Sequence, residues 1–175
     1  MKSEGEATNP EVLGEGRFLR LVSNDGWEYV TRRRGTDVVG IVAVTDQNEL
    51  ILVRQHRMAV AGEVLELPAG LVGDESDGET ALAAAKRELE EETGFTCERV
   101  EPLTRGASSA GLTDEQVLLV RAWKVRRIGE GGGVGGEQIT VVTLPLHQAR
   151  EHLLEVANNG GCIDFKVWAA LAFLA

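Results

Sequence analysis

The sequence predicts an α+β fold in which helices cover a mixed β-sheet, and two observations support this prediction. Short runs rich in β-branched residues fill the first part of the chain and return after one strongly helical segment. Two further helical segments follow them. Because strands and helices come in groups, a regular alternation of strand and helix is not expected. The 175 residues suit one domain with its own hydrophobic core.

The order of the elements follows from local patterns. Residues 1–16 are rich in Gly and Glu and lack periodicity, so we expect a flexible arm there. Asp25-Gly26 lies between two apolar runs and predicts a hairpin turn. Strands are expected over 18–22, 27–33, 38–44, 49–54, 64–67, 98–105, 115–123 and 139–144. Helices are expected over 79–92, 146–158 and 162–174. The chain therefore divides into the arm (1–16), N-terminal strands (17–36) and a main domain (37–175).

Charge and apolar content exclude several classes of function. The formal net charge is −10, from 18 basic and 28 acidic residues, whereas nucleic-acid-binding proteins usually carry an excess of positive charge. No apolar run approaches the roughly 18 residues of a membrane span, and residues 1–10 lack the apolar segment of a secretory signal. Cys97 and Cys162 are far apart and form no disulfide or zinc pattern. We therefore expect a cytosolic protein that binds neither nucleic acid nor a membrane.

Three glutamates share one face of the first expected helix. Glu88, Glu91 and Glu92 fall within an arc of about 100°, where like charges repel each other. A hard cation such as Mg²⁺ would make this cluster favourable, because Mg²⁺ takes oxygen ligands. Arg87 lies beside the arc and can orient a carboxylate from the side. The apolar stripe next to the arc consists of Leu82, Ala85 and Leu89. The alternative interpretation is a solvated acidic helix face.

Residues 73–95 resemble the Nudix box, G-x5-E-x7-R-E-U-x-E-E-x-G-U, in which U is a bulky apolar residue. The fixed positions are Gly73, Glu79, Arg87, Glu88, Leu89, Glu91, Glu92, Gly94 and Phe95. The resemblance implies the Nudix fold, an α/β/α sandwich with a mixed sheet, in which the box forms a loop, a helix and a second loop. It also implies hydrolysis of a nucleoside diphosphate linked to another moiety, with Glu79 and Arg87 holding the box together.

The resemblance further implies a metal site. Glu88 and Glu92 would bind a divalent metal, Mg²⁺ with Mn²⁺ as a substitute, and Glu91 would contribute directly or through water. The backbone carbonyl of Ala69, just before the box, would also bind the metal. The chemistry agrees, because metals neutralise the charge of a diphosphate and lower the pKa of a bound water.

Three further stretches resemble the ADP-ribose pyrophosphatase subgroup of this family, namely 53–57 followed by 66–70, 108–115 and 27–32. In that subgroup an antiparallel N-terminal strand extension forms a homodimer whose two chains share the active sites, so a homodimer is implied here. The implied substrate-binding residues are Trp27, Arg32, Arg57 and Glu115. An aromatic face suits a nucleobase, and guanidinium groups suit phosphates. The competing interpretations are core or dimer packing for the tryptophan, surface charges for the arginines and a structural role for the glutamate.

One residue departs from the subgroup pattern. Ala110 stands where ADP-ribose hydrolases usually carry Pro, which is associated with a preference for ADP-ribose. The expected reaction is Mg²⁺-dependent hydrolysis of ADP-ribose to AMP and ribose 5-phosphate, or of a similar nucleoside diphosphate sugar. GDP-mannose and other nucleotide sugars are the alternative substrates. A Nudix-fold module that binds a nucleotide sugar without cleaving it is the alternative of another class.

The glycine-rich segment 129–136 formally fits G-x-G-x-x-G, but a strand pattern follows it where a dinucleotide-binding turn requires a helix. We therefore expect a mobile loop and no Rossmann fingerprint. Glu137 follows this loop, where ADP-ribose hydrolases carry a loop glutamate that is a candidate general base. We expect Glu137 to orient or deprotonate the attacking water. A solvated loop acid is the alternative interpretation, and Glu91 is the alternative base.

Overall fold

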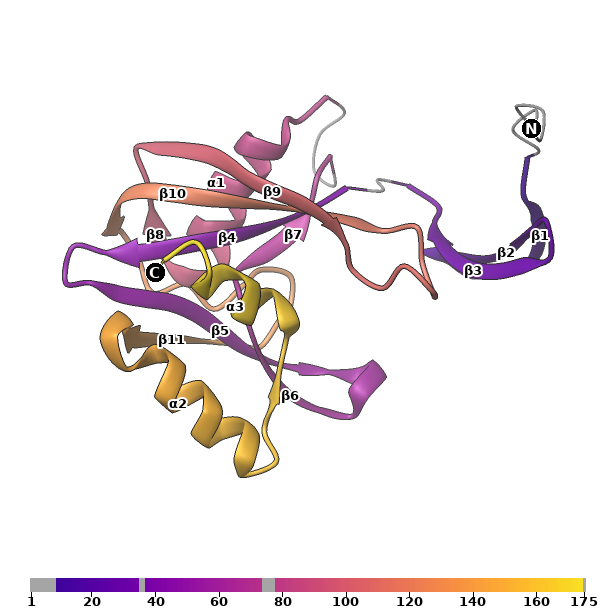
Figure 1. The fold of residues 1–175 in the computed structure, drawn as a ribbon. Coiled ribbons are helices and arrows are strands. Elements are labelled where there is room, and N and C mark those ends of the chain that lie inside the picture. The colour runs from indigo at the N-terminus through magenta and orange to yellow at the C-terminus, as the bar shows by residue number, and fades with distance from the viewer. Residues whose placement is uncertain (1–8, 35–36, 74–77, 175) are drawn as a thin grey trace, which may run out of the picture.

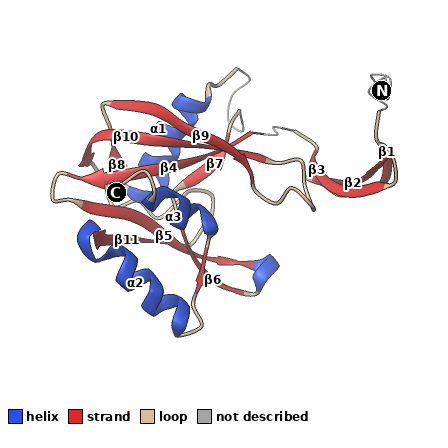
Figure 2. Cartoon of the chain, in the orientation of Figure 1, coloured by secondary structure: helices blue, strands red, loops and turns tan. Residues whose placement is uncertain are grey.

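The body of the molecule has three layers, with a mixed β-sheet between one helix on one face and two helices on the other (Figure 1). The structure is a computed structural model and describes residues 9–34, 37–73 and 78–174. Figure 2 shows the same view coloured by secondary structure. The predicted α+β class with a mixed sheet is confirmed.

The central sheet contains nine strands. They are β4 (Asp37–Thr45), β5 (Glu49–Arg57), β6 (Gly62–Glu66), β7 (Ala69–Leu71), β8 (Phe95–Thr96), β9 (Arg99–Ala107), β10 (Gln116–Arg127), β11 (Ile139–Pro145) and β12 (Cys162–Ile163). The sheet is mixed because β10 runs parallel to β4 and β12 runs parallel to β6. Since β4 and β5 pair at Val44 and Leu50 alone, the two halves of the sheet diverge from that end (Figure 1).

Helices cover both faces of the sheet and bury its β-branched side chains. The described residues form three helices, α1 (Ala81–Thr93), α2 (Leu146–Asn158) and α3 (Phe165–Leu171), and a short 3-10 turn spans Met58–Val60. On the α1 side, Leu89 packs in one buried cluster with Ile41 and Val120. On the opposite side, Leu153 of α2 packs with Leu52 of β5. None of the described helices has both the length and the apolar content needed to cross a bilayer.

The N-terminal strands form a second, antiparallel sheet that projects from the body beside the tip of the β9–β10 hairpin (Figure 1). Its strands are β1 (Glu11–Glu15), β2 (Leu19–Asn24) and β3 (Trp27–Arg32). Val30 N donates to the Leu112 carbonyl at 2.8 Å, and Thr31 Oγ1 donates to Asp114 Oδ2 at 2.8 Å. The N-terminal sheet is therefore attached directly to the segment 108–115.

Two expectations from the sequence are wrong in detail. Glu11–Glu15 were expected in a flexible arm, but they form β1, because the edge of β2 offers backbone partners and Glu15 pairs with Arg20 across the ladder. Residues 1–8 of the expected arm lie outside the described residues. The helix expected over 162–174 is shorter, because Cys162–Ile163 pair with β6 and Asp164 then caps α3.

The first helix also begins later than expected. It was expected from Glu79, but it starts at Ala81 because the Thr80 side chain is the N-cap and accepts a hydrogen bond from Ala83 N at 3.3 Å. Leu82 of the expected apolar stripe is 38% exposed, and Ala84 lies on the buried face instead.

Candidate active site

Arg87 joins the acidic side chains of the box. Its Nε and Nη2 donate to the two carboxylate oxygens of Glu79 at 3.0 and 3.2 Å. Its Nη1 donates to Glu88 Oε1 at 2.8 Å and to Glu91 Oε2 at 3.1 Å. Glu79 also accepts a hydrogen bond from Gly73 N at 3.1 Å, and the Arg87 guanidinium holds the pKa of Glu79 below its usual range. The structure thus places Arg87 beside the carboxylates and ties the loop before α1 to the helix.

Glu92 is a buried carboxylate that faces β7. Only 5% of the residue is exposed, and its Oε2 accepts a hydrogen bond from Ala69 N at 3.1 Å. Burial, together with the nearby charges of Glu88 and Glu137, raises the pKa of Glu92 to about 8. A carboxylate in such an environment is strongly stabilised when a cation shares its site. The structure therefore brings the Glu92 side chain and the backbone of Ala69 together.

Gly70 makes room for Glu88 where β7 passes α1. A Cβ on residue 70 would lie 1.9 Å from Glu88 Oε1 and 2.0 Å from Glu88 Cδ. The Glu88 carboxylate therefore lies against the backbone of β7, and burial raises its pKa. Since Glu92 is bonded to the preceding residue, Ala69, the two carboxylates approach neighbouring positions of one strand.

This set of donors fits a hard divalent cation. Two partly or fully buried carboxylates, Glu88 and Glu92, lie beside the backbone of Ala69, and all three offer oxygen ligands. Among the described residues, no three acidic, histidine or cysteine side chains form a ready-made metal cage, and Arg87 engages Glu88 and Glu91. Mg²⁺ usually keeps several waters and uses one or two carboxylates, so such a cage is not required.

The glycine-rich segment after β10 packs against the C-terminal end of α1. Gly132 N donates to the Glu92 carbonyl at 2.9 Å, and Gly133 N donates to the Glu91 carbonyl at 3.1 Å. Glu137 Oε2 accepts a hydrogen bond from Val134 N at 3.2 Å. The Glu137 charge contributes to the raised pKa values of Glu88 and Glu92, so Glu137 lies near the box carboxylates. The strand β11 follows the loop, which excludes a dinucleotide-binding turn.

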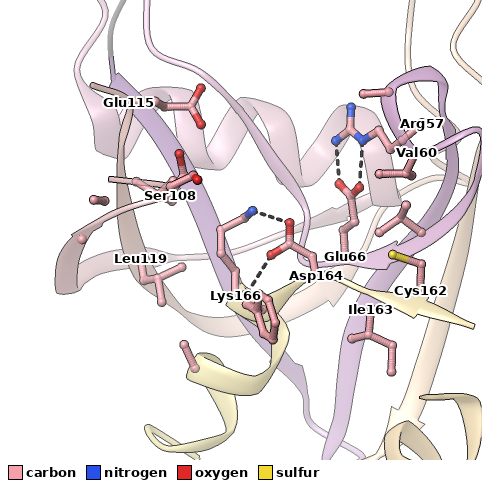
Figure 3. Close-up of a pocket in the computed structure, with 18 of the residues that line it drawn as sticks. Arg57, Val60, Glu66, Ser108, Glu115, Leu119, Cys162, Ile163, Asp164 and Lys166 are labelled. Carbon is pink, nitrogen blue, oxygen red and sulfur yellow. Dashed lines mark hydrogen bonds and ion pairs between the residues drawn. The ribbon is translucent and has the colours of Figure 1, made fainter. Parts of the chain in front are cut away.

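A cavity of about 690 Å³ lies between the β5–β6 end, the β9–β10 hairpin and α3 (Figure 3). On one side, Arg57 and the buried Glu66 form a bidentate pair, with Nε–Oε1 at 2.8 Å and Nη2–Oε2 at 2.5 Å. The pKa of Arg57 is raised mainly by Glu66, with smaller contributions from Glu92 and Asp164. Arg57 therefore lies close to both the box and the cavity. Glu115 lines the opposite side of the cavity.

Glu115 also connects the cavity to the N-terminal sheet. Arg32 Nε and Nη2 donate to Glu115 Oε2 at 2.9 and 2.5 Å. Of the expected substrate-binding residues, Arg57 and Glu115 thus line the main cavity, and Arg32 reaches it through Glu115. Trp27 lies elsewhere, 72% exposed, and lines a second cavity of about 260 Å³ that Ala110 also lines. The one departure from the subgroup pattern is therefore a neighbour of Trp27.

Sequence reasoning did not assign a role to four charged residues of the main cavity. They are Glu66, Arg105, Asp164 and Lys166. Glu66 lies in the stretch 66–70 that resembles the subgroup, so the signal for it was present in the motif. Asp164 precedes a helical run, which is an N-cap pattern, but its place on the cavity depends on the pairing of β12 with β6. No local pattern indicates Lys166.

Comparisons with known proteins agree with this architecture. A family model of the NUDIX domain matches residues 35–158. The methanol dehydrogenase activator of Bacillus methanolicus is 32% identical, over 87% of this chain and 84% of its own. The ADP-sugar pyrophosphatase of Mus musculus is 30% identical, over 93% of this chain and 84% of its own. The ADP-ribose pyrophosphatase of Bacillus subtilis (strain 168) is 29% identical, over 78% of this chain and 70% of its own.

A solved structure described as an ADP compounds hydrolase has the same fold. Its TM-score is 0.68 at 25% identity, and the match covers 87% of this chain and 85% of that one. The region that the family model matches contains the whole box and every strand of the central sheet except β12. The chain therefore belongs to the Nudix hydrolase family.

Proposed function

We propose that this hydrolase cleaves the diphosphate of a nucleoside diphosphate sugar, with ADP-ribose as the first candidate and AMP and ribose 5-phosphate as products. One observation supports the proposal most directly: Arg57, whose charge interacts with that of the box carboxylate Glu92, lines a cavity of about 690 Å³. Such a volume lies within the usual range for small-ligand sites. Relatives named ADP-ribose pyrophosphatase and ADP-sugar pyrophosphatase support the same substrate class.

In this proposal, Glu88, Glu92 and the carbonyl of Ala69 hold a divalent metal, Mg²⁺ or in its place Mn²⁺, and Glu91 contributes directly or through water. When bound, the metal neutralises the diphosphate charge and lowers the pKa of the attacking water. Glu79 and Arg87 keep the carboxylates in place. The close approach of the Glu88 carboxylate to Gly70 and the buried position of Glu92 support this assignment.

The substrate contacts extend from the box toward the N-terminal sheet. Arg57 binds a phosphate oxygen through Nη1, because its Nε and Nη2 are bonded to Glu66. Glu115, with Arg32 bonded to it, borders the cavity on the side opposite Arg57. Trp27 offers an exposed aromatic face on which a nucleobase can stack. Glu137 acts as general base on the attacking water, which its proximity to Glu88 and Glu92 supports.

Replacing Gly70 by Ala is expected to reduce kcat/KM by about tenfold to a hundredfold, the usual range for residues that orient metal ligands. The new methyl group would displace the Glu88 carboxylate. The measurement is a Mg²⁺ titration of AMP release, in which the variant needs more Mg²⁺. Gly14→Ala is the matched control, because nothing lies within 4 Å of its new Cβ. Identical Mg²⁺ dependence in the two variants would contradict the role of Gly70 in positioning Glu88.

We propose that the N-terminal sheet mediates a homodimer. Its exposed large apolar side chains are Val12, Leu13, Phe18, Leu19, Leu21 and Trp27. Exposed apolar patches of this kind mark interaction surfaces. Light scattering should give twice the 18.9 kDa of one chain, and Leu21→Asp should shift the mass toward a single chain. A wild-type mass of 18.9 kDa would refute the dimer.

We place the protein in the cytosol because of its thiols. Cys97 is buried and Cys162 is exposed, and both are free. Free thiols are the rule in a reducing compartment.

Two alternatives follow from particular observations. Ala110 beside Trp27, and relatives named GDP-mannose pyrophosphatase in Enterobacter sp. (strain 638) and Escherichia coli O9:H4 (strain HS), favour GDP-mannose as a second substrate. A module that binds a nucleotide sugar without cleaving it is the alternative of another class. Against it stands the complete set of box glutamates.

A substrate panel with Mg²⁺ tests the proposal. The panel contains ADP-ribose, GDP-mannose, ADP-glucose, NADH, diadenosine polyphosphates and 8-oxo-dGTP, with release of the nucleoside monophosphate as the readout. We expect the highest kcat/KM for a nucleoside diphosphate sugar and no turnover by Glu92→Gln. Preference for 8-oxo-dGTP or a diadenosine polyphosphate would overturn the substrate class. Binding without turnover by the wild-type chain would favour the non-catalytic module.

A further inference from the structure

Asp164 and Lys166 form an ion pair in the wall of the 690 Å³ cavity, and the reaction described above does not use them. Lys166 Nζ lies 2.5 Å from Asp164 Oδ2, and the two side chains are 26% and 23% exposed. The pair lies between Ser108 and Glu115 on one side and the Arg57–Glu66 pair on the other (Figure 3). An occupant of the cavity would therefore meet both charges.

The pair is held in a fixed position by backbone contacts. Asp164 N donates to the Leu65 carbonyl of β6 at 3.0 Å, and Asp164 Oδ1 accepts a hydrogen bond from Lys166 N at 2.7 Å. An ammonium has three donors and a carboxylate has about four acceptor sites. Within the described part of the chain, Lys166 Nζ forms a hydrogen bond and an ion pair with Asp164 alone. Donors and acceptors therefore remain side by side for an occupant.

The other charges of the cavity are also paired. Arg57 bonds to Glu66, Glu115 bonds to Arg32, and Arg105 bonds to Asp37. Beyond Arg57 Nη1, a phosphate chain entering this part of the cavity would have to compete with a carboxylate for each cation. Neighbouring hydroxyl groups meet no such competition, because one can accept from the Lys166 ammonium while another donates to the Asp164 carboxylate. The chemistry of the wall thus favours an uncharged, hydroxylated group.

We propose that Asp164 and Lys166 bind neighbouring hydroxyl groups of a sugar ring of the substrate and so determine specificity. The inference rests on the proposed function, since it concerns the sugar of a nucleoside diphosphate sugar. Two rings have the required chemistry, the ribose of the nucleoside and the sugar on the far side of the diphosphate.

Three substrates separate these sources in the full-length chain with Mg²⁺. They are ADP-ribose, its analogue with 2′-deoxyadenosine, and the methyl ester of ADP, which lacks the distal sugar. The test variants are Lys166→Met and Asp164→Asn. Asn keeps the N-cap of α3, so the second variant removes the charge without removing the cap. Lys124→Met is the matched control, because it breaks an exposed ion pair with Glu98 outside the cavity.

We expect the wild-type chain to prefer ADP-ribose over at least one analogue by about tenfold or more, because hydrogen bonds to charged groups have this effect on affinity. Both test variants should lose about tenfold to a hundredfold in kcat/KM on ADP-ribose and little on that analogue. If the test variants no longer discriminate against the methyl ester, the pair binds the distal sugar. If they no longer discriminate against the deoxy analogue, the pair binds the ribose of the nucleoside. The control variant should match the wild type.

The inference is overturned if both preferences stay unchanged in the test variants, or if the wild-type chain turns over all three substrates equally. Failure of the proposed function looks different, because the wild-type chain would then release no AMP in a manner that depends on Glu92. Calorimetric binding of ADP-ribose and the methyl ester to Glu92→Gln, with and without Lys166→Met, measures the same preference without turnover. Equal affinities there would also overturn it.

Discussion

Replacing Glu92 by Gln is expected to lower kcat for AMP release by about a thousandfold or more. The carboxylate links α1 directly to β7 at the proposed metal site, since it accepts a hydrogen bond from Ala69 N. Metal stabilisation of a phosphoryl transition state amounts to several kcal/mol, and each 1.36 kcal/mol corresponds to about tenfold in rate. Steady-state kinetics on the best substrate of the panel provides the measurement.

The fold should survive this change, because the Gln side chain has the same shape and its carbonyl oxygen can still accept from Ala69 N. Glu90→Gln is the matched control: it lies on the same helix, outside the fixed positions of the box, and keeps an acceptor for the Thr96 hydroxyl. Its activity should stay near that of the wild type. If Glu92→Gln retains more than about a tenth of the wild-type kcat, Glu92 is not an essential ligand.

The wild-type chain and Glu92→Gln should also differ in how their stability depends on pH when no metal is bound. Burial raises the pKa of Glu92 from 4.5 to about 8 on folding, so between these values the folded state binds more protons than the unfolded state. Stability contributed by Glu92 therefore falls as the pH rises through this window. In urea unfolding with EDTA, the wild-type chain should lose stability relative to Glu92→Gln between pH 4.5 and 8. A difference that does not vary with pH would contradict the raised pKa.

Replacing Glu137 by Gln is expected to lower kcat by about a hundredfold to ten-thousandfold, the usual contribution of a general base. Glu137 lies near Glu88 and Glu92, and the loop that carries it is bonded to the end of α1. The amide cannot take a proton from the attacking water, so the loss should appear in kcat with little change in KM. This second readout separates a base from a residue that only shapes the loop.

Two comparisons make this test specific. Glu130→Gln, in the same glycine-rich segment but exposed, should leave kcat near the wild-type value. Glu91→Gln measures the competing assignment of the base to the box itself. A loss of less than about threefold in Glu137→Gln would remove Glu137 from the mechanism. A larger loss in Glu91→Gln would transfer the role to Glu91.

The features that local patterns predicted are those set by spacing along the chain. The i, i+3, i+4 glutamates and Arg87 share one helix, so their proximity follows from helix geometry alone. The buried strands follow from β-branched runs, and the hairpin at Asp25-Gly26 follows from turn chemistry. In each case the residues that determine the structure lie within a few positions of each other in the sequence.

The features that were missed depend on partners far away in the sequence. Gly70 opposes Glu88 because β7 passes α1, and no local pattern shows that approach. Cys162–Ile163 looks like part of a helix until β6 offers an edge for pairing, and this pairing places Asp164 and Lys166 on the cavity. β1 likewise forms only because β2 is available beside it. Tertiary context overrides weak local preference at such positions.

The attachment of the N-terminal sheet to the cavity wall has a thermodynamic consequence. Arg32 of β3 and Glu115 of the wall share two hydrogen bonds, so the sheet and the wall cannot move independently. Any self-association that favours one position of Arg32 then changes substrate affinity by some factor, and substrate changes the association constant by the same factor. Such reciprocity would make activity per chain depend on protein concentration.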